Sequence, residues 1–560
     1  MTHPTTRRRS SAAVAAMAAA MLLAGAASCA AQDARVAPPA RTAVDVLDYD
    51  IALVLPDSGR RIAGDATLTV HRRVQLDTLV LDFMDLAVSD VAVNGRAVPV
   101  TRTAETLRIP LGPGHGDTLK VRVRYAGVPT DGLIIRDTLG RWSAFGDNWP
   151  NRARYWIPSV DHPSDKATVS WAVTVPPGRT VVANGGRLAA GRIRAQYDRA
   201  NPTIRYREAR PIPTYLMVIA AGALQRTELG DTACGLAEMT RCVAQEVWTL
   251  PTSTQPLPGP FARAGDIVSL FSRLVAPFPY EKLAHLQSAT IFGGMENAGA
   301  IFYDSRLFET GRMSEGLIAH ETAHQWFGDA VTETEWRDLW LSEGFATYFA
   351  ALWTEHSRGV DSLRAQMAGI RAEILADTAA VTHRAVIDTT WRSPMELLNR
   401  NSYEKGGWVL HMLRGTVGDS AFFRGVRAYY LANRHRNADT KALQLAVEQA
   451  SGKTLGWFFD QWLRRPGYPE LTLGWRHDAA KREVVVQLEQ GARFGAYRFT
   501  LPLAVVDAAG KRHKMLVEVS GAKDLLRLPV PFDGAPAALI VDPDVELLAR
   551  VTVHALPPSS

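Results

Sequence analysis

Two histidines and two glutamates are spaced in this sequence as a metal-dependent reaction centre would require. His320, Glu321 and His324 form the pattern His-Glu-x-x-His. Residues four apart lie one above the other on a helix, so both imidazoles can reach one ion. Glu343, which eighteen residues separate from His324, can supply a third ligand. Two nitrogens and one carboxylate oxygen, with a fourth position left for water, suit zinc.

Glu321 adds a proton acceptor to this set. It faces the ion without binding it, so it can take a proton from the water that the ion holds. The pattern His-Glu-x-x-His also arises by chance on amphipathic helices. Glu343 favours the metal site, because a carboxylate in a tryptophan-rich apolar helix needs a partner.

The spacing brings these side chains together only if the residues lie on helices. The apolar residues of 315–319 and 325–327 have the spacing of a buried helix, and Gly328 is expected to end that helix. The eighteen residues between His324 and Glu343 are enough for one turn and the start of a second, antiparallel helix. We therefore predict two neighbouring helices that carry the ligands.

Two further segments accompany the metal-binding pattern. Residues 293–300 read Gly-Gly-Met-Glu-Asn-Ala-Gly-Ala, and residues 401–407 read Asn-Ser-Tyr-Glu-Lys-Gly-Gly. Together with His-Glu-x-x-His and the Ser-Glu-Gly-Phe-Ala of 342–346, they have the order and spacing of a known family. The sequence resembles the gluzincin aminopeptidases of the M1 family, relatives of aminopeptidase N and leukotriene A4 hydrolase, from about Tyr49 to at least Tyr468.

This resemblance implies a zinc-dependent aminopeptidase, with one zinc ion per chain, that hydrolyses the N-terminal peptide bond of peptides with a free N-terminus. A zinc-activated water would attack the scissile carbonyl, with Glu321 as the general base. Tyr403 would donate its hydroxyl to the oxyanion, and the alternative role for it is that of a core tyrosine. The sequence does not choose among Asp338, Glu333 and Glu335 as hydrogen-bond partners of the zinc histidines.

The resemblance also implies how the substrate is held. Glu296 would bind the free α-ammonium group, so that only the first peptide bond reaches the metal. Its segment is expected to run as an extended edge strand whose glycines let the backbone approach the substrate. The implied substrate-binding residues are Gly293, Gly294, Met295, Glu296 and Asn297.

One segment departs from the family pattern. The family usually places a second amine-anchoring Glu or Gln before a Phe-Pro-Cys-x-Asp-Glu-Pro segment. Here residues 157–163 read Ile-Pro-Ser-Val-Asp-His-Pro, and an ungapped count places Trp149 at the anchor position. A small shift of the alignment would place Asp147 or Asn148 there, so the anchor stays unassigned.

Two other functions fit parts of the same pattern. One is an epoxide hydrolase like leukotriene A4 hydrolase, and the other is a non-catalytic peptide-binding or adhesion protein on the same fold. We do not expect the first, because the sequence shows no large helical C-terminal domain. We do not expect the second, because a binding protein need not retain the ligands, the base and the tyrosine together.

The chain is expected to fold as several domains, because 560 residues are too many for one hydrophobic core. Alternating apolar residues over 119–125 predict strands, and Asn94-Gly95 predicts a hairpin turn. Helical periodicity follows at 361–463, and strand patterns return near the end. We predict an α+β multidomain fold, which by resemblance comprises an N-terminal β-rich saddle at 43–224, a thermolysin-like α/β zinc peptidase domain at 225–465 and a small C-terminal β-sandwich at 466–560.

The first 31 residues have the pattern of a signal peptide. A run of three arginines at 7–9 precedes an alanine-rich apolar stretch too short to span a membrane. We expect an exported protein, periplasmic or extracellular, without an integral membrane segment in the mature chain. Cleavage near Ala31 and a lipid anchor at Cys29, as in an outer-membrane lipoprotein, are alternatives. In an oxidising compartment Cys234 and Cys242 are expected to form a disulfide.

Composition and charge disfavour other classes of protein. Hydrophobic residues make up 47% of the chain and charged residues 21%, as in soluble globular proteins. The formal net charge of +6 is spread along the chain. Diffuse positive charge is typical of a solvated surface, so nucleic-acid binding is not expected.

Overall fold

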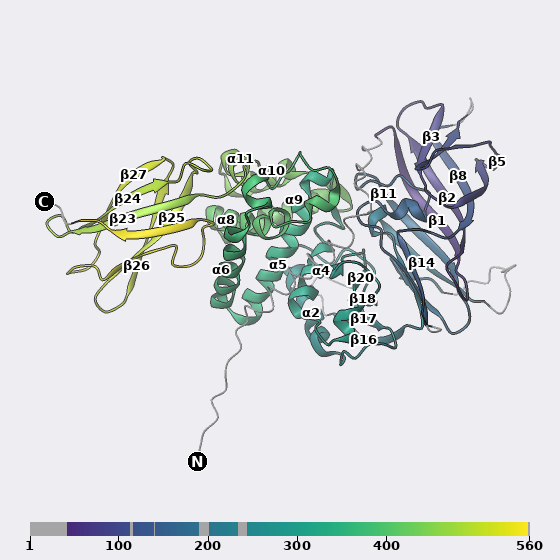
Figure 1. Cartoon of the computed structure of the whole chain (residues 1–560), viewed down its shortest axis with the longest axis horizontal. Coiled ribbons are helices and arrows are strands. Elements are labelled where there is room, and N and C mark those ends of the chain that lie inside the picture. Colours follow the sequence, from purple (N-terminus) through teal and green to yellow (C-terminus); the bar gives the residue numbers. More distant parts are fainter. Residues whose placement is uncertain (1–41, 112–115, 139–140, 190–200, 233–242, 558–560) are drawn as a thin grey trace, which may run out of the picture.

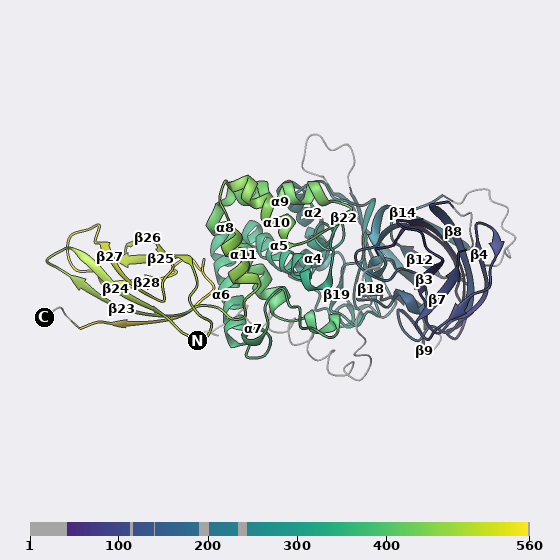
Figure 2. The same ribbon diagram turned by 90° about the horizontal axis from the view of Figure 1, so that it is seen from above.

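The computed structural model describes residues 42–111, 116–138, 141–189, 201–232 and 243–557. Three parts lie in a row: a β-rich part, a largely helical part and a second β-rich part (Figure 1). The view from above shows the same order (Figure 2). The predicted signal peptide, Cys29, and the predicted disulfide of Cys234 and Cys242 lie outside the described residues. Within the described ranges, no helix is long and apolar enough to cross a membrane.

Three sheets build the first part. Their strand orders are β13-β14-β11-β1-β2-β8-β4-β5, β12-β15-β10-β9 and β3-β7-β6. The strands are β1 (Val44–Val54), β2 (Ile62–Arg72), β3 (Thr78–Asp82), β4 (Ala87–Val93), β5 (Arg96–Ala97), β6 (Thr101–Arg102), β7 (Thr106–Pro110), β8 (Thr118–Gly127), β9 (Leu133–Thr138), β10 (Arg141–Gly146), β11 (Lys166–Thr174), β12 (Thr180–Ala183), β13 (Gly186–Arg187), β14 (Thr203–Pro213) and β15 (Ile219–Gly222).

Local sequence signals account for these strands. In β8 every second residue from Leu119 to Tyr125 is buried, which confirms the predicted alternation. Asn94 and Gly95, with φ angles of 51° and 81°, form the predicted turn between β4 and β5. Both residues tolerate the positive φ that a two-residue hairpin turn requires.

The middle part packs helices against a five-stranded sheet of order β16-β17-β18-β20-β19. Its strands are β16 (Gln225–Thr232), β17 (Val243–Thr249), β18 (Lys282–Ser288), β19 (Gly294–Met295) and β20 (Ala300–Asp304). The helices are α2 (Ala264–Leu274), α3 (Ser305–Glu309), α4 (Glu315–His324), α5 (Trp340–Arg358), α6 (Val360–Ala376), α7 (Ala380–His383), α8 (Gly406–Val417), α9 (Asp419–Asn433), α10 (Thr440–Ser451) and α11 (Gly456–Leu463). A parallel pair, β21 (Val331–Glu333) and β22 (Arg436–Ala438), joins distant segments.

Two sheets form the last part, with strand orders β27-β24-β23-β29 and β26-β25-β28. The strands are β23 (Glu470–Asp478), β24 (Glu483–Gln490), β25 (Phe499–Val506), β26 (Arg512–Val519), β27 (Lys523–Pro529), β28 (Ala538–Val541) and β29 (Arg550–Ala555). The succession of a β-rich part, a mixed part and a β-sheet part confirms the predicted fold class.

The connection between the two ligand-bearing helices differs from the prediction. Helix α4 ends at His324 rather than at Gly328. The main chain then forms a wider, π-type turn, in which the amide of Asp329 donates to the oxygen of His324, five residues back, at 3.0 Å. Strand β21 and a 3-10 helix, η4 (Trp336–Asp338), precede α5 where a single turn was expected. Strand β21 pairs with β22, about a hundred positions further on. The periodicity of the local sequence does not predict a pairing between segments so far apart.

Candidate metal centre and active site

Three potential ligand atoms from α4 and α5 converge on one point. The Nε2 atoms of His320 and His324 are 3.2 Å apart. Glu343 Oε2 lies 3.4 Å from the first and 3.3 Å from the second. Ligand atoms about 2.0–2.2 Å from a tetrahedral zinc ion stand about 3.3–3.5 Å from one another. The side chains therefore have the spacing that zinc requires.

The chemistry of these atoms also suits a cation. Glu343 Oε2 is buried and has no hydrogen-bond partner among the described residues. A buried carboxylate oxygen without a partner is costly. An ion held by this oxygen and the two imidazole nitrogens would remove that cost, so the residues fit a zinc ion.

Hydrogen bonds at Nδ1 of His324 orient the ring so that Nε2 faces the other ligands. Its Nδ1 lies 3.2 Å from the main-chain oxygen of Phe327 and 2.9 Å from Ser342 Oγ. An Nδ1–H that donates to these oxygens leaves the lone pair on Nε2, which is the form that binds a metal. A Cβ at Gly328 would lie 2.3 Å from Ser342 Oγ, so the glycine keeps room for this contact.

Among the described residues, none of the three carboxylates considered from the sequence is hydrogen-bonded to a zinc histidine. Asp338 accepts a hydrogen bond from Thr440 instead. Glu335 is 43% exposed, and neither buried oxygen of Glu333 has a partner within the described ranges. Ser342 fills the role for His324, and its position directly before Glu343 was the only signal for it in the sequence.

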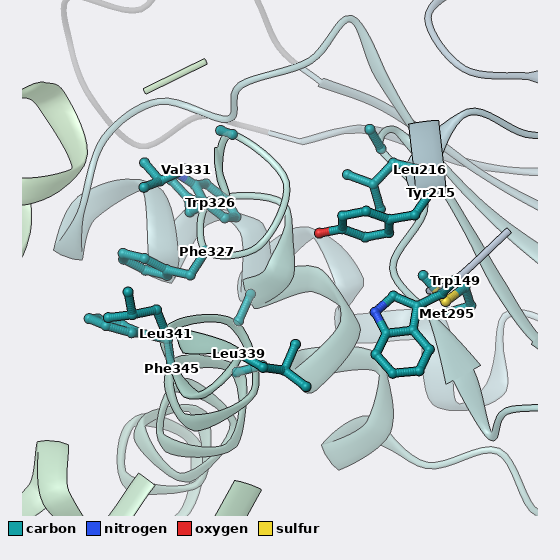
Figure 3. Close-up of a cluster of buried hydrophobic side chains, with 14 of the residues drawn as sticks. Trp149, Tyr215, Leu216, Met295, Trp326, Phe327, Val331, Leu339, Leu341 and Phe345 are labelled. Carbon is teal, nitrogen blue, oxygen red and sulfur yellow. The ribbon is translucent and has the colours of Figure 1, made fainter. Parts of the chain in front are cut away.

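Close packing fixes the two ligand helices relative to each other. The rings of Phe327, just after α4, and Phe345, in α5, stack with centroids 4.1 Å apart. Figure 3 shows Trp326 and Phe327 next to Leu341 and Phe345, at the junction of the two helices.

A second close contact brings Tyr403 to the ligands. A Cβ on Gly344 in α5 would lie 2.9 Å from the carbonyl carbon of Gly406, at the start of α8. Glycine at both positions therefore allows the two backbones to touch. Glu343 directly precedes Gly344, and Tyr403 lies three residues before Gly406. The close approach of α5 and α8 therefore brings Glu343 and Tyr403 together.

Glu321 is buried in α4 against the edge strand β19. A Cβ on Gly294 would lie 2.1 Å from Glu321 Oε1, so only a glycine lets the carboxylate pack on this strand. Burial raises the pKa of Glu321 well above the ordinary value for a glutamate, and the charges of Glu296 and Glu343 add to the shift. The Glu321 carboxylate therefore has a higher proton affinity than an exposed glutamate.

Glu296 lies close to both Glu321 and His324. Potential ligand atoms of Glu296, Glu321 and His324 all lie within 4.8 Å of one another. Strand β19 is the edge of the five-stranded sheet, as expected for this segment, but it covers only Gly294 and Met295. Glu296 directly follows the strand and precedes a turn from Asn297 to Ala300. Burial raises the pKa of Glu296 to about 7, and the charge of Glu343 contributes.

The remaining residues of this segment surround that turn. Gly293 has open space where a Cβ would stand. Met295 is buried, and Figure 3 draws it in the buried cluster that also contains Trp149. Asn297 is fully buried, and its amide group makes no hydrogen bond within the described ranges.

Tyr403 reaches the metal ligands from a π-helical turn, η6 (Asn401–Lys405). Such turns often occur at functional sites. The phenol ring is parallel to the imidazole of His320 within 10°, with centroids 6.1 Å apart. Burial raises its pKa well above the ordinary value for a tyrosine, with further contributions from the charges of Glu343 and Glu296. The hydroxyl thus keeps its proton near neutral pH and can donate it in a hydrogen bond.

The three candidates for a second amine anchor all have structural partners. Asp147 is fully buried, and its Oδ2 lies 3.1 Å from Nη2 of Arg152. Asn148 donates its amide hydrogens to two main-chain oxygens. Trp149 packs edge-on against Phe292. The Asp147 carboxylate, which a small shift of alignment would bring to the anchor position, is therefore already paired with a cation.

Two family models match this chain. Residues 46–216 match the peptidase M1 N-terminal domain, and residues 267–462 match the peptidase family M1 domain. The chain belongs to peptidase family M1. The second match includes every potential ligand and both segments that flank the metal-binding pattern in the sequence.

This M1 family member is also similar to solved structures. An M1 zinc metallopeptidase from Deinococcus radiodurans is 29% identical, with a TM-score of 0.67, over 77% of this chain and 95% of that one. Aminopeptidase A of Legionella pneumophila, in complex with aspartic acid, shares the fold at 18% identity and a TM-score of 0.78, over 94% of this chain and 61% of that one.

Among sequence relatives, probable aminopeptidase 1 of Sulfurisphaera tokodaii is 27% identical over 82% of this chain and 58% of its own length. The chain spans 52% to 60% of the length of three such curated relatives.

Loss of one ligand should weaken the metal centre. The substitution His324→Ala removes one of three protein ligands, so we expect zinc affinity to fall at least about tenfold. Zinc content, measured after treatment with a chelator and titration with zinc, tests this. His162, a buried histidine outside the site, provides the control, because His162→Ala should leave zinc affinity unchanged. Unaltered zinc affinity in folded His324→Ala protein would contradict the ligand assignment.

Proposed function

We propose that this M1 family protein is a zinc-dependent aminopeptidase that removes the N-terminal residue from peptides with a free amino group. The observation that carries the proposal is the position of Glu296, an anionic side chain beside Glu321 and His324 at the end of an edge strand. A fixed anion there orders the ammonium group of a peptide so that the first carbonyl lies at the metal ligands. A mutant of the Deinococcus radiodurans enzyme was solved with a Tyr-Ser-Ala substrate, which supports a peptide as the ligand.

The protein's own side chains divide the reaction among them. His320, His324 and Glu343 would hold one zinc ion, which when bound polarises a carbonyl and makes water more acidic. Glu321 accepts a proton from the attacking water on its carboxylate and returns it to the departing amine. The hydroxyl of Tyr403 donates a hydrogen bond to the carbonyl oxygen as negative charge develops there.

A pair of substrates that differ only in an acetyl group on the terminal nitrogen tests the role of Glu296. An aminoacyl-coumarin with a free amine should be hydrolysed, and its N-acetylated twin should not. The substitution Glu296→Ala should raise KM and lower kcat together, with a fall in kcat/KM of about 10–100-fold, because the substrate loses both a contact and its alignment. Equal hydrolysis of both substrates by the unsubstituted enzyme would exclude an aminopeptidase.

A further inference from the structure

The side chain of Gln325 connects the zinc helix to the substrate-binding turn. Its Nε2 donates to the main-chain oxygen of Glu296 at 2.6 Å and to Asp329 Oδ2 at 2.8 Å. Its Oε1 accepts a hydrogen bond from the amide of Gly299 at 2.8 Å. Both amide hydrogens and the amide oxygen are thus used, and the residue is fully buried.

These bonds hold both ends of the short segment from Glu296 to Gly299. The turn closes through a hydrogen bond from the amide of Ala300 to the oxygen of Asn297, and Gly299 adopts a φ of +66°. Gln325 directly follows His324 in the chain. One side chain therefore joins the segment that carries the amine-binding carboxylate to the helix that carries two metal ligands.

Two other side chains, a buried Asn184 and a partly buried Lys282, hold the same turn from outside the zinc helix. Asn184, from the N-terminal β-rich part, donates to the oxygen of Ala298 at 2.9 Å. Lys282, in β18, donates to the oxygen of Gly299 at 3.1 Å. They hold the turn from other parts of the chain, whereas Gln325 alone among the three directly follows the helix of the metal ligands.

We propose that Gln325 is a positioning residue that sets the distance between the Glu296 carboxylate and the metal ligands, and thereby confines cleavage to the first peptide bond. The inference rests on the proposed aminopeptidase function. Peptide bonds repeat about every 3.5 Å, so an anchor that moves by 1 Å relative to the metal misplaces the reacting carbonyl. Misplacement of that size can cost about 100-fold in rate.

The contacts explain why glutamine suits this position. A glutamate of the same shape, when ionised, accepts but cannot donate, and it would face the oxygens of Glu296 and Asp329. Asparagine has the same amide but is one methylene shorter, so it cannot reach Glu296, Asp329 and Gly299 together. Methionine fills a similar volume and makes none of the three bonds.

The test compares Gln325→Met with a matched control, Gln490→Met. Gln490 lies in the last β-rich part and is nearly buried. It also makes three main-chain hydrogen bonds, to the oxygens of Tyr497 and Gly521 at 2.8 Å and 2.9 Å and from the amide of Tyr497 at 2.9 Å. Both variants thus lose three hydrogen bonds, but only Gln325→Met releases the turn.

For each variant, kcat/KM is measured on the free aminoacyl-coumarin and on its N-acetylated twin, together with zinc content and melting temperature. We expect Gln325→Met to retain zinc and to lose about 10–100-fold in kcat/KM on the free substrate. The N-acetylated twin, which the unsubstituted enzyme should leave uncut at the detection limit, should be hydrolysed measurably, so that the ratio of free to acetylated hydrolysis falls at least about tenfold below the lower bound for the unsubstituted enzyme. Gln490→Met should lower the melting temperature similarly and leave that ratio unchanged.

Gln325→Asn guards against a folding defect, since it keeps the polar group. It should lower the same ratio with a smaller change in melting temperature. If both Gln325 variants fold, bind zinc and keep the ratio of the unsubstituted enzyme, the residue has only a structural role and the proposal is wrong. If the unsubstituted enzyme itself shows no preference for the free amine, the aminopeptidase function fails instead.

Discussion

Glu321→Gln protein should bind zinc like the unsubstituted enzyme and lose activity by a factor of ~10²–10⁴ or more. Glutamine keeps the shape of the side chain, so it still packs against Gly294, where a Cβ would lie 2.1 Å from Oε1. It has no carboxylate to accept a proton from water or to return one to the leaving amine. The loss should therefore appear in kcat, at every pH at which the enzyme is active.

Steady-state kinetics and zinc analysis on the same preparation check this prediction. Glu315→Gln offers a control, because Glu315 begins the same helix and lies outside the ligand set. That control should keep its kcat. A well-folded Glu321→Gln enzyme that keeps more than about a tenth of the activity would remove Glu321 from the role of general base.

Tyr403→Phe enzyme should show a kcat lowered by ~10²–10³ with KM nearly unchanged. The substitution leaves the ring that lies parallel to His320 and removes only the hydroxyl donor. That donor acts on charge that is absent from the bound substrate and develops in the transition state. An interaction of this kind affects kcat and leaves binding almost untouched.

A buried tyrosine outside the site separates this effect from a loss of stability. Tyr429 stacks on Phe345 with centroids 6.2 Å apart, so Tyr429→Phe should change stability alone. If Tyr403→Phe behaves like Tyr429→Phe, with a normal kcat and a lower melting temperature, then Tyr403 belongs to the core. A tyrosine reaching the metal ligands from a π-helical turn makes the kinetic outcome the expected one.

The sequence by itself determined what depends on local spacing. His320 and His324 share a helical face because helices repeat every 3.6 residues, and this holds before any tertiary contact forms. The strand from Leu119 to Tyr125 can be predicted in the same way, because its apolar residues alternate with polar ones, the two-residue period of a β-strand. The turn at Asn94 needed only residues that tolerate positive φ. Family resemblance added Glu296 and Tyr403, which no local rule selects.

Only the tertiary structure decided which polar groups meet, because those contacts join residues far apart in the chain. The sequence offered three carboxylates as partners for the zinc histidines, whereas the fold placed Ser342 against His324. It offered Asp147 as an amine anchor, but the fold paired that carboxylate with Arg152. Gln325 carried no signal of its own, since its partner Glu296 lies 29 positions away. A periodic pattern records which face of an element is buried, and the packing of elements against one another determines what each buried group touches.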